Sequence, residues 1–267
     1  MGTNAAVSEA VELVTTRVED GVVTLTLNQG DRFNPLSTRM IAALEAALDR
    51  VAADRTNRVV VLAGAGRGFC AGHDLKEMRA HSADKAWQAA LFESCSRMMQ
   101  KITQIPQPVI ARVHGVASAA GCQLVASCDL AVAAEEARFA LPGVNVGLFC
   151  STPAVAVARN VGRKRAMELL LTGELFDART ALDWGLVNRV VPADRLDAEI
   201  ARFTSIVVAR SGNVVASGKR AFYRQIDQPL VPAYEGTSET MACSMMEPDA
   251  VEGIDAFLAK RAPRWPE

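Results

Sequence analysis

The chain has 267 residues, 50% of them hydrophobic, which is enough for a sizeable core in one large domain. Its 29 basic and 30 acidic residues give a net charge of −1 and form no long run of one sign, so nucleic acid and anionic membranes are poor candidates for main partners. No apolar run reaches the roughly 18 residues that a membrane-spanning helix needs.

The N-terminus and the cysteines bear on cellular location. Residues 1–21 contain no basic segment followed by an apolar one, and they predict neither a secretory signal nor a mitochondrial presequence. The six cysteines lie at irregular positions, mostly within apolar segments, and lack the paired spacing of a zinc site. We therefore expect a reduced, cytoplasmic protein that binds no metal ion.

The first 195 residues alternate strand and helix patterns. Residues 22–27 read as the second arm of a hairpin, and the apolar run 58–63 as a buried strand. Ser37 is the expected N-cap of a helix that runs to about residue 53. Further helices are predicted at 84–104, 118–127, 151–160, 164–171 and 178–184, and further strands at 109–113, 130–134, 138–141 and 187–191.

From residue 196 onward only helical periodicity remains. The predicted helices cover residues 196–209, 213–226, 232–245 and 248–261. The sequence therefore predicts an α/β core over residues 1–195, with sheets covered by helices, and an all-helical region over residues 196–267.

The stretch Gly66–Leu75 (GRGFCAGHDL) directly follows the buried strand 58–63. Its three glycines let the backbone turn sharply and approach a ligand closely. Main-chain N–H groups presented in this way can stabilise a developing negative charge. Taken alone, Gly64–Gly68 is more simply a turn, and its spacing differs from the GxGxxG of dinucleotide folds.

A second stretch, His114–Leu124 (HGVASAAGCQL), enters a helix through small residues. The first N–H groups of a helix lack intrahelical partners and lie at the positive end of its dipole. Ala119–Cys122 can therefore offer donors to an anion, although a tightly packed small-residue helix explains this segment equally well. The combination of the two stretches favours the anion site.

Both stretches resemble signatures of the crotonase family, also called the enoyl-CoA hydratase/isomerase superfamily. RGFCAGHDL is similar to the family's first loop, and HGVASAAGCQL is similar to its HGxAxGGGxxL segment. Residues 27–37 (LNQGDRFNPLS), 162–192 and 256–261 (AFLAKR) resemble further family segments, so the resemblance covers nearly the whole chain. It implies a crotonase-type β/α spiral core and a helical C-terminal region that mediates assembly into a homotrimer or a hexamer, a dimer of trimers.

The resemblance also implies an acyl-CoA site in fatty acid metabolism, with coenzyme A bound as part of the substrate and no separate cofactor. The thioester oxygen would accept hydrogen bonds from the main-chain N–H groups of His73 and Ala120, which would form an oxyanion hole. The expected coenzyme A contacts are Arg32, Ala71, His73, Leu75 and Lys76, with Phe257 and Lys260 supplied by a neighbouring subunit. For the cations among them, the alternative is ordinary surface charge without a function.

The chain departs from the family at the residues that move protons. Family hydratases use two glutamates, and the corresponding residues here are Gln123 and Gly143. Glutamine cannot accept a proton from water and glycine has no side chain, whereas each general acid or base is worth roughly 10²–10⁴ in rate. A third family carboxylate corresponds to Ser151. We therefore expect weak hydration, which Gln123→Glu combined with Gly143→Glu should raise.

Other side chains of the expected pocket have plainer explanations. Cys150 has no motif-placed histidine to activate it and is typical of a small buried hydrophobe. Ser151 is more simply the cap of the helix that begins there. Glu93 could reach the acyl group, with a solvated helix face as the alternative. The expected pocket also includes Asn145, Phe149 and Thr152.

Two functions remain from the sequence. One is an acyl-CoA enzyme, either a lyase of the enoyl-CoA hydratase type or a thioesterase or decarboxylase that needs the oxyanion hole without both glutamates. The other is a non-catalytic acyl-CoA-binding or assembly protein, which Gln123 and Gly143 favour. Fold alone does not distinguish them.

Overall fold

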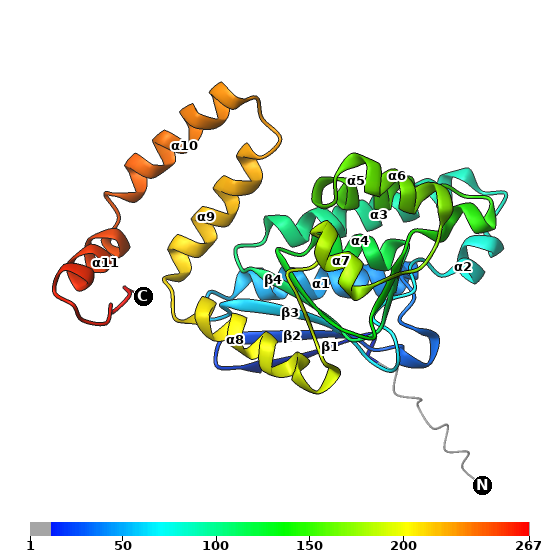
Figure 1. Ribbon diagram of the computed structural model, residues 1–267, viewed down its shortest axis with the longest axis horizontal. Coiled ribbons are helices and arrows are strands. Elements are labelled where there is room, and N and C mark those ends of the chain that lie inside the picture. Colours follow the sequence, from blue (N-terminus) through cyan, green and yellow to red (C-terminus); the bar gives the residue numbers. More distant parts are fainter. Residues whose placement is uncertain (1–11, 267) are drawn as a thin grey trace, which may run out of the picture.

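The computed structural model describes residues 12–266, which form a sheet-and-helix body with a helical extension (Figure 1). The absence of a leader peptide was predicted from residues 1–21, and the first eleven of these lie outside the described range. The main sheet has six strands in the order β1-β2-β3-β4-β6-β9. They are β1 (Val14–Glu19), β2 (Val22–Leu27), β3 (Val59–Gly64), β4 (Val109–Val113), β6 (Leu130–Ala134) and β9 (Arg189–Val191).

The pairing in this sheet follows from the connections. β1 and β2 pair antiparallel through a tight turn, which confirms the predicted hairpin. The pairs from β2 to β9 are all parallel and are joined by helical crossovers. β3 is buried along nearly its whole length, as expected for a strand covered on both faces.

Helices cover both faces of the main sheet. α1 (Thr38–Ala53) places its apolar residues on one side and is capped by Ser37, whose Oγ accepts the Met40 N–H at 3.1 Å, as predicted. α8 (Leu196–Val208) covers the opposite face, where Leu196 and Ile200 pack against strand residues such as Val61. The other helices of the body are α2 (Leu75–Ala80), α3 (Lys85–Gln104), α4 (Ala120–Ser127), α5 (Ser151–Asn160), α6 (Arg163–Thr172) and α7 (Ala178–Trp184).

A small second sheet, in the order β5-β7-β8, differs from the prediction at its first strand. Ser118 was expected to begin a helix, but it ends strand β5, and the helix begins at Ala120. The small residues of Val116–Ser118 lead directly into the helix and resemble its first turn, and the two-residue strand β8 was missed as well. The sequence analysis also missed helix α2, which has only six residues. The strands are β5 (Val116–Ser118), β7 (Arg138–Ala140) and β8 (Phe176–Asp177).

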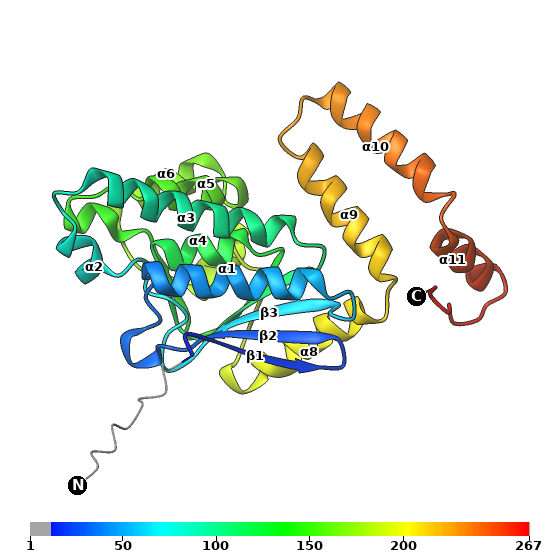
Figure 2. The same ribbon diagram turned by 180° about the vertical axis from the view of Figure 1, so that it is seen from behind.

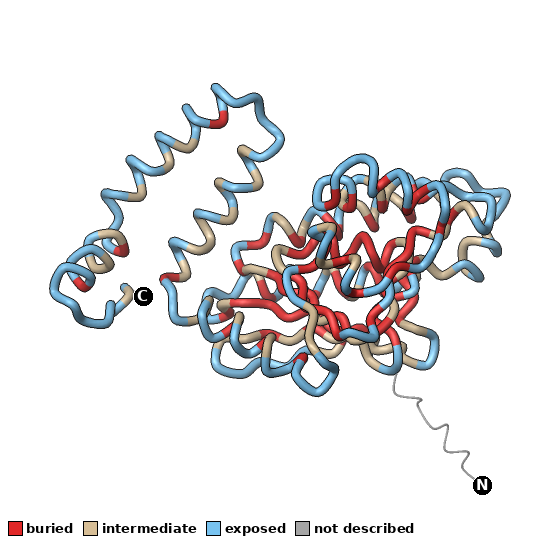
Figure 3. Tube along the Cα trace, viewed as in Figure 1, coloured by how far each residue is buried: buried red, intermediate tan, exposed pale blue. Residues whose placement is uncertain are grey.

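The last three helices extend away from the body, as Figures 1 and 2 show from opposite sides. We call α9 (Gly212–Gln225), α10 (Leu230–Ser244) and α11 (Pro248–Leu258) the arm. Most of the arm is exposed (Figure 3). The described residues after 195 contain no strand, so the predicted change to an all-helical region is confirmed. The predicted boundary coincides with the start of α8, although α8 itself packs on the sheet.

The architecture is therefore the α/β fold with a helical C-terminal region that the sequence predicted. Its hydrophobic core lies mainly between the sheet and α1, α3 and α4. Across residues 12–266, none of the helices combines the length and the apolar character needed to cross a membrane.

Candidate functional site

The two stretches that the sequence singled out lie against each other. The Phe69 and Cys70 N–H groups of the first loop (Gly66–Leu75) both donate to the Val116 carbonyl, at 2.9 and 3.1 Å. The Ser118 N–H returns a bond to the Cys70 carbonyl at 2.9 Å. The first loop is thus bonded to strand β5, which leads directly into helix α4.

Glycines allow the backbones of the two stretches to touch. A Cβ added to Gly72 would lie 3.2 Å from the Ala120 nitrogen and 2.9 Å from the Ala119 Cβ. A Cβ on Gly121 would lie 2.1 Å from the Cys70 carbonyl oxygen. Gly72 also has a φ of +92°, which side chains rarely adopt. Both positions therefore require glycine for this close approach.

The His73 main-chain N–H is left available by its surroundings. Leu36 pairs with the first loop by donating its N–H to the Gly72 carbonyl at 2.8 Å and accepting the Asp74 N–H at 3.4 Å. This pairing skips the His73 N–H, which donates to no backbone acceptor within residues 12–266.

The Ala120 N–H is available for a different reason. The Gln123 N–H makes the first intrahelical bond of α4, to the Ala119 carbonyl at 3.1 Å, so the Ala120 N–H lies ahead of the helical ladder. Ala119 has a φ of 49°, an uncommon value for a residue with a Cβ, and it redirects the chain from β5 into α4. Since His73 follows Gly72, two free donors lie close together beside the positive end of a helix.

The His73 side chain does not provide a charge at neutral pH. Burial lowers the pKa of His73 to about 4, against the opposing attraction of Glu77. The ring lies edge-to-face against Phe92, with the ring centroids 5.3 Å apart. We therefore assign the ring a packing role and the main-chain N–H the capacity to bind an anion.

Asp74 fixes the end of the first loop. Its side chain caps helix α2 by accepting the Lys76 N–H at 3.0 Å, and it forms an ion pair with Arg32 at 2.7 Å. Burial opposes ionisation of Asp74, but the hydrogen bonds from Arg32, Glu77 and Lys76 outweigh it and lower the pKa of this carboxyl. Arg32, expected at a phosphate, is thus paired within the chain.

The residues expected to contact coenzyme A fall into two separate groups. Ala71, Leu75 and Lys76 are exposed on or beside the first loop. Phe257, 82% exposed, lies on α11 of the arm, and Lys260 follows α11 by two residues. This helix is at the far end of the molecule from α2 (Figures 1 and 2). Within one chain the two groups do not meet, so their joint role needs a second subunit and stays a prediction.

Gln123 and Gly143 lie in tightly packed surroundings. Gln123 is buried, and its Oε1 has no partner among the described residues. A Cβ on Gly143 would lie 2.9 Å from both the Cys150 Sγ and the Leu148 carbonyl oxygen. A glutamate at position 143 would therefore displace residues 148–150. The expectation that Gln123→Glu with Gly143→Glu raises hydration stays a prediction, and the double variant would first have to accommodate this contact.

Ser151 is not the cap of α5. Cys150 occupies the N-cap position and Ser151 is the first helical residue, with its Oγ 3.4 Å from the Phe149 carbonyl oxygen. The cap prediction was wrong because the helix starts one residue earlier than a hydroxyl cap requires. Burial raises the pKa of the Cys150 thiol, so this residue stays protonated and is a poor nucleophile.

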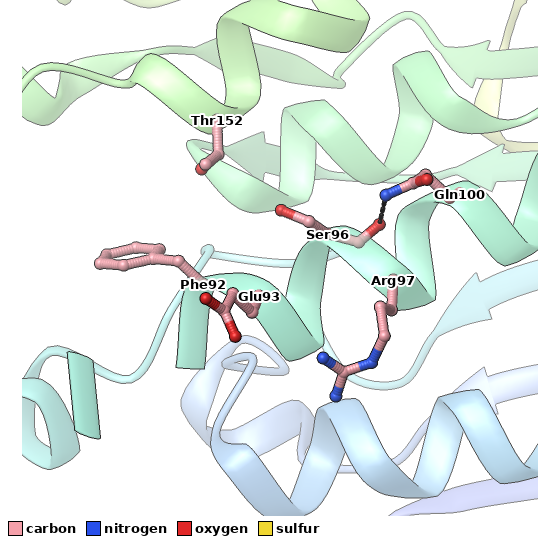
Figure 4. A pocket seen from close by; sticks show the side chains of 6 residues that line it. All are labelled: Phe92, Glu93, Ser96, Arg97, Gln100 and Thr152. Atoms are coloured by element: carbon pink, nitrogen blue, oxygen red, sulfur yellow. Dashed lines mark hydrogen bonds between the residues drawn. The ribbon is translucent and has the colours of Figure 1, made fainter. Parts of the chain in front are cut away.

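An open pocket of about 450 Å³ adjoins this region (Figure 4). Glu93 and Thr152 were expected near an acyl group, whereas the other polar residues of α3 in this pocket were not. Their four-residue spacing along α3 was the available signal, but it does not distinguish a pocket from a solvated helix face. The lining consists of Phe92, Glu93, Ser96, Arg97, Gln100 and Thr152.

A metal centre is not evident in the described part of the chain, where no group of three or more His, Cys, Asp or Glu residues could hold an ion. All six cysteines are free thiols, and five are buried.

Comparison with known proteins identifies a family and relatives that match most of the chain. A family model described as enoyl-CoA hydratase/isomerase matches residues 17–267. The mouse protein named enoyl-CoA hydratase domain-containing protein 3, mitochondrial, is 44% identical over 253 residues, which are 95% of this chain and 84% of that protein. A crystal structure of an enoyl-CoA hydratase from Mycobacterium smegmatis is 56% identical, with a TM-score of 0.93 over 95% of this chain and 98% of that one. The crystal structure of the human enoyl-CoA hydratase domain-containing protein 3 is 43% identical, with a TM-score of 0.92 over 95% and 100% of the two chains.

The comparison contradicts the predicted cytoplasmic location. Five vertebrate relatives, 42–45% identical to this chain, are all named as mitochondrial proteins. The prediction was wrong in its reasoning, because free cysteines indicate reducing surroundings without distinguishing one reducing compartment from another.

Proposed function

The chain belongs to the enoyl-CoA hydratase/isomerase family, and from this premise we propose that it binds an acyl-CoA thioester and polarises the thioester carbonyl. The observation that carries the proposal is the contact of Gly72 with Ala120. It brings the free His73 and Ala120 main-chain N–H groups together. The thioester oxygen accepts a hydrogen bond from each N–H, and these donors stabilise the negative charge that develops on the oxygen during reaction.

The first loop also provides contacts for the coenzyme A part of the thioester. Ala71, Leu75 and Lys76 are exposed there, so the adenine end of coenzyme A lies along this surface with Lys76 near its phosphates. Arg32 supports this surface through Asp74. Phe257 and Lys260 reach the same coenzyme A from the arm of a neighbouring subunit of a homotrimer, because within one chain they lie at the other end of the molecule.

The oxyanion hole is tested by isotope-edited infrared spectroscopy of a thioester with a ¹³C-labelled carbonyl. We expect the carbonyl stretch to move to lower frequency when acetyl-CoA binds. Gly72→Ala, whose Cβ would press on Ala119 and Ala120, should abolish this shift. Gly218→Ala is the control, since no atom lies within 4 Å of its added Cβ. A carbonyl that binds without any shift in the unmodified protein contradicts the proposal.

The reaction itself is an acyl-CoA conversion that does not depend on two glutamates. Gln123 cannot accept a proton at neutral pH and Gly143 has no side chain, so hydration at ordinary hydratase rates is not expected. Thioester hydrolysis and decarboxylation are chemically compatible with the site, because both place negative charge on the thioester oxygen.

A non-catalytic acyl-CoA-binding protein is the second candidate, favoured by the lack of space for a side chain at Gly143. Loss of the enoyl absorbance of crotonyl-CoA, together with release of free thiol from acyl-CoA, separates the two. Rapid hydration of crotonyl-CoA would contradict the expectation that Gln123 and Gly143 cannot replace the two glutamates. Absence of any turnover combined with calorimetric binding of acetyl-CoA would favour the binder, and absence of binding would overturn both candidates.

A further inference from the structure

The residues that follow α11 close the arm into a loop. The Trp265 indole N–H donates to the Ala209 carbonyl oxygen at 2.9 Å, and Ala209 ends α8, which packs on the main sheet. Figures 1 and 2 show the C-terminal end beside the first turn of α9 in both views. Among residues 12–266, this is the one hydrogen bond or ion pair that joins residues 248–266 to the chain before α10. It therefore ties the far end of the arm to the body.

The Trp265 ring also contacts α11. A Cβ added to Gly253 would lie only 3.3 Å from this ring, closer than most Cβ contacts. The Trp265 side chain is half-buried, whereas residues 261–264 are exposed. Tryptophan combines a large apolar ring with one polar N–H. Here the ring packs on α11 and the N–H reaches the end of α8, so one side chain connects the two helices.

Glu252 holds the turn that follows α11. Its carboxylate accepts hydrogen bonds from both Nη atoms of Arg261, at 2.6 and 2.8 Å, and from the Arg264 N–H. Paired bonds between a guanidinium and a carboxylate fix the orientation of both groups as well as their distance. The bonds from Arg261 lower the pKa of Glu252 to about 2, so the carboxylate is charged at neutral pH. We call Glu252, Arg261 and Trp265 the clasp.

Lys260 lies in the turn that the clasp holds. Its φ is 53°, and the turn is closed by the Lys260 N–H, which donates to the Phe257 carbonyl at 3.1 Å, and by the Arg261 N–H, which donates to the Ala256 carbonyl at 3.0 Å. Glycine is favoured at this position of a helix end, because a Cβ is disfavoured at positive φ. A lysine here costs stability, and a strained backbone of this kind indicates a role for the side chain.

The clasp leaves the charge of Lys260 free. Glu252 pairs with Arg261, the next residue along the chain, whereas Lys260 is exposed and forms no ion pair with any of residues 12–266. An ammonium group on a flexible stem is a general phosphate ligand, and holding its backbone in one place reduces what binding must order. The structure thus combines a free cation with a fixed base.

We propose that Glu252, Arg261 and Trp265 are positioning residues, which hold Lys260 where its amino group meets a phosphate of the coenzyme A bound to the neighbouring subunit. The proposal rests on the proposed function, in which Lys260 reaches that coenzyme A. Glu252 fixes the turn relative to α11, and Trp265 fixes it relative to the body. Affinity for a ligand falls with the fraction of molecules in the binding-competent arrangement. Opening the clasp therefore weakens binding without removing a coenzyme A contact.

The test measures the dissociation constant of acetyl-CoA by calorimetry on the full chain. Lys260→Gly keeps the left-handed turn and should weaken binding about tenfold, through loss of one charge-assisted hydrogen bond. Glu252→Gln combined with Trp265→Phe, the clasp variant, keeps Lys260 and should also weaken binding about tenfold. Glu199→Gln is the matched control, because Glu199 likewise pairs with an arginine of its own helix, Arg202 at 2.8 Å, and its loss should leave binding unchanged.

Combining the substitutions separates positioning from a general structural role. In the Lys260→Gly background, the clasp variant should weaken acetyl-CoA binding little further, because the group that the clasp positions is gone. Equal weakening in both backgrounds would overturn the proposal. A clasp variant with a lower sedimenting mass would also overturn it, since affinity would then be lost through disassembly.

Two further outcomes distinguish the clasp from the proposed function. Unchanged acetyl-CoA binding by the clasp variant, together with weaker binding by Lys260→Gly, would overturn the clasp alone. Unchanged binding by Lys260→Gly would instead count against the shared coenzyme A site of the proposed function, and the clasp would lose its premise.

Discussion

Asn34 positions the first loop through a fully buried amide. Its Nδ2 donates to the carbonyl oxygens of Ala65, Gly68 and Phe69 at 2.9–3.0 Å, and its Oδ1 accepts the Gln29 N–H at 2.9 Å. Three of these four contacts lie within or just before the loop that carries His73. Asn34 acts through the loop backbone, so we regard it as a positioning residue.

Asn34→Asp should weaken both stability and carbonyl polarisation. The variant keeps the shape but turns the donor into an oxygen that faces three carbonyl oxygens, which should cost at least about 1–3 kcal/mol of unfolding free energy. Urea denaturation measures this cost, and the infrared shift of bound acetyl-CoA measures the polarisation. Asn28→Asp is the control, since its Nδ2 makes one exposed bond, to the Glu12 carbonyl. An unchanged infrared shift in the Asn34→Asp variant would contradict the positioning role.

Gly143→Ala should destabilise the protein by about 1–3 kcal/mol through overpacking. The added Cβ would meet the Cys150 Sγ and the Leu148 carbonyl oxygen, both at 2.9 Å, and backbone cannot move as freely as a side chain. Gly218→Ala, in an open helical position, should instead stabilise by about 0.5–1 kcal/mol. Urea denaturation at one protein concentration measures both changes in the free energy of unfolding. Equal effects of the two substitutions would contradict overpacking, because residues 148–150 would then move aside at little cost in stability.

The half-buried His73 ring should make stability depend on pH. Its pKa falls from 6.5 to about 4 on folding, so between these values the unfolded chain takes up a proton that the folded chain does not. The free energy of unfolding should therefore fall as the pH falls from about 6.5 to 4, by up to roughly 3 kcal/mol. The contribution of the neutral His73 ring to stability is fully present above pH 6.5. Denaturation at pH 7, 6 and 5 measures the slope.

His114 contributes with the same sign, because burial also lowers its pKa. His73→Gln should remove most of the slope and keep the main-chain N–H of residue 73. If the slope is the same in this variant, the His73 ring titrates normally in the folded protein.

At the residue scale, the sequence predicted roles that depend on neighbours in the chain better than roles that depend on tertiary packing. Ser37 was correctly predicted as a cap because the cap and its helix are adjacent in sequence. The cap role of Ser151 was wrong by one residue, and the contact of Gly143 with Cys150 depends on a tertiary packing that no local pattern encodes. The close approach of Gly72 and Ala120 is likewise visible only in three dimensions.

At the scale of elements, long periodic segments were predicted well, whereas short strands β5 and β8 and short helix α2 were missed. α1, α3 and the three arm helices have apolar positions repeated over three or more turns, and the structure confirms each of them. Strand β5 has three residues and is held by bonds from the first loop, about 45 residues earlier in the chain. Such pairing carries almost no local signal.

Helix α9 joins the arm to the body through a buried ion pair. The Lys219 Nζ, with a side chain only 6% exposed, donates to Asp129 at 2.7 Å and to the Ile102 and Gln107 carbonyl oxygens. The Tyr223 hydroxyl, one turn later, donates to the same carboxylate at 2.9 Å. Burial lowers the pKa of Lys219 against the attraction of Asp129.

Lys219→Met should therefore cost about 3–5 kcal/mol, because it leaves the Asp129 charge buried without its partner. Lys219→Met with Asp129→Asn should cost less than the single variant, since the unpaired charge is gone. Arg179→Met is the control: its ion pair with Asp183 is exposed and should be worth less than about 1 kcal/mol. Chemical denaturation gives all three values. A double variant less stable than Lys219→Met would contradict the charge argument.

At the scale of the whole molecule, the arm presents more apolar surface than a stable monomer normally leaves uncovered. Large hydrophobic side chains on α10 and α11 and in the turns beside the arm helices are more than half exposed, and the described residues offer nothing to cover them. They include Ile226, Leu230, Val231, Tyr234, Met241, Met245, Met246, Val251, Phe257 and Leu258. The proposed homotrimer supplies a cover, since each arm would then lie against a neighbouring subunit.

The chain should therefore sediment as a trimer or a hexamer at micromolar concentration. Met246→Ser combined with Phe257→Ser removes two side chains that are 83% and 82% exposed, so it should lower the sedimenting mass without unfolding the body. Val18→Ser is the control, because Val18 is 59% exposed on strand β1, away from the arm, and its loss should leave the mass unchanged. If Phe257 also contacts coenzyme A in the neighbouring subunit, the double variant should weaken acetyl-CoA binding together with assembly. A monomeric unmodified protein with full acetyl-CoA affinity would contradict both the assembly and the shared site.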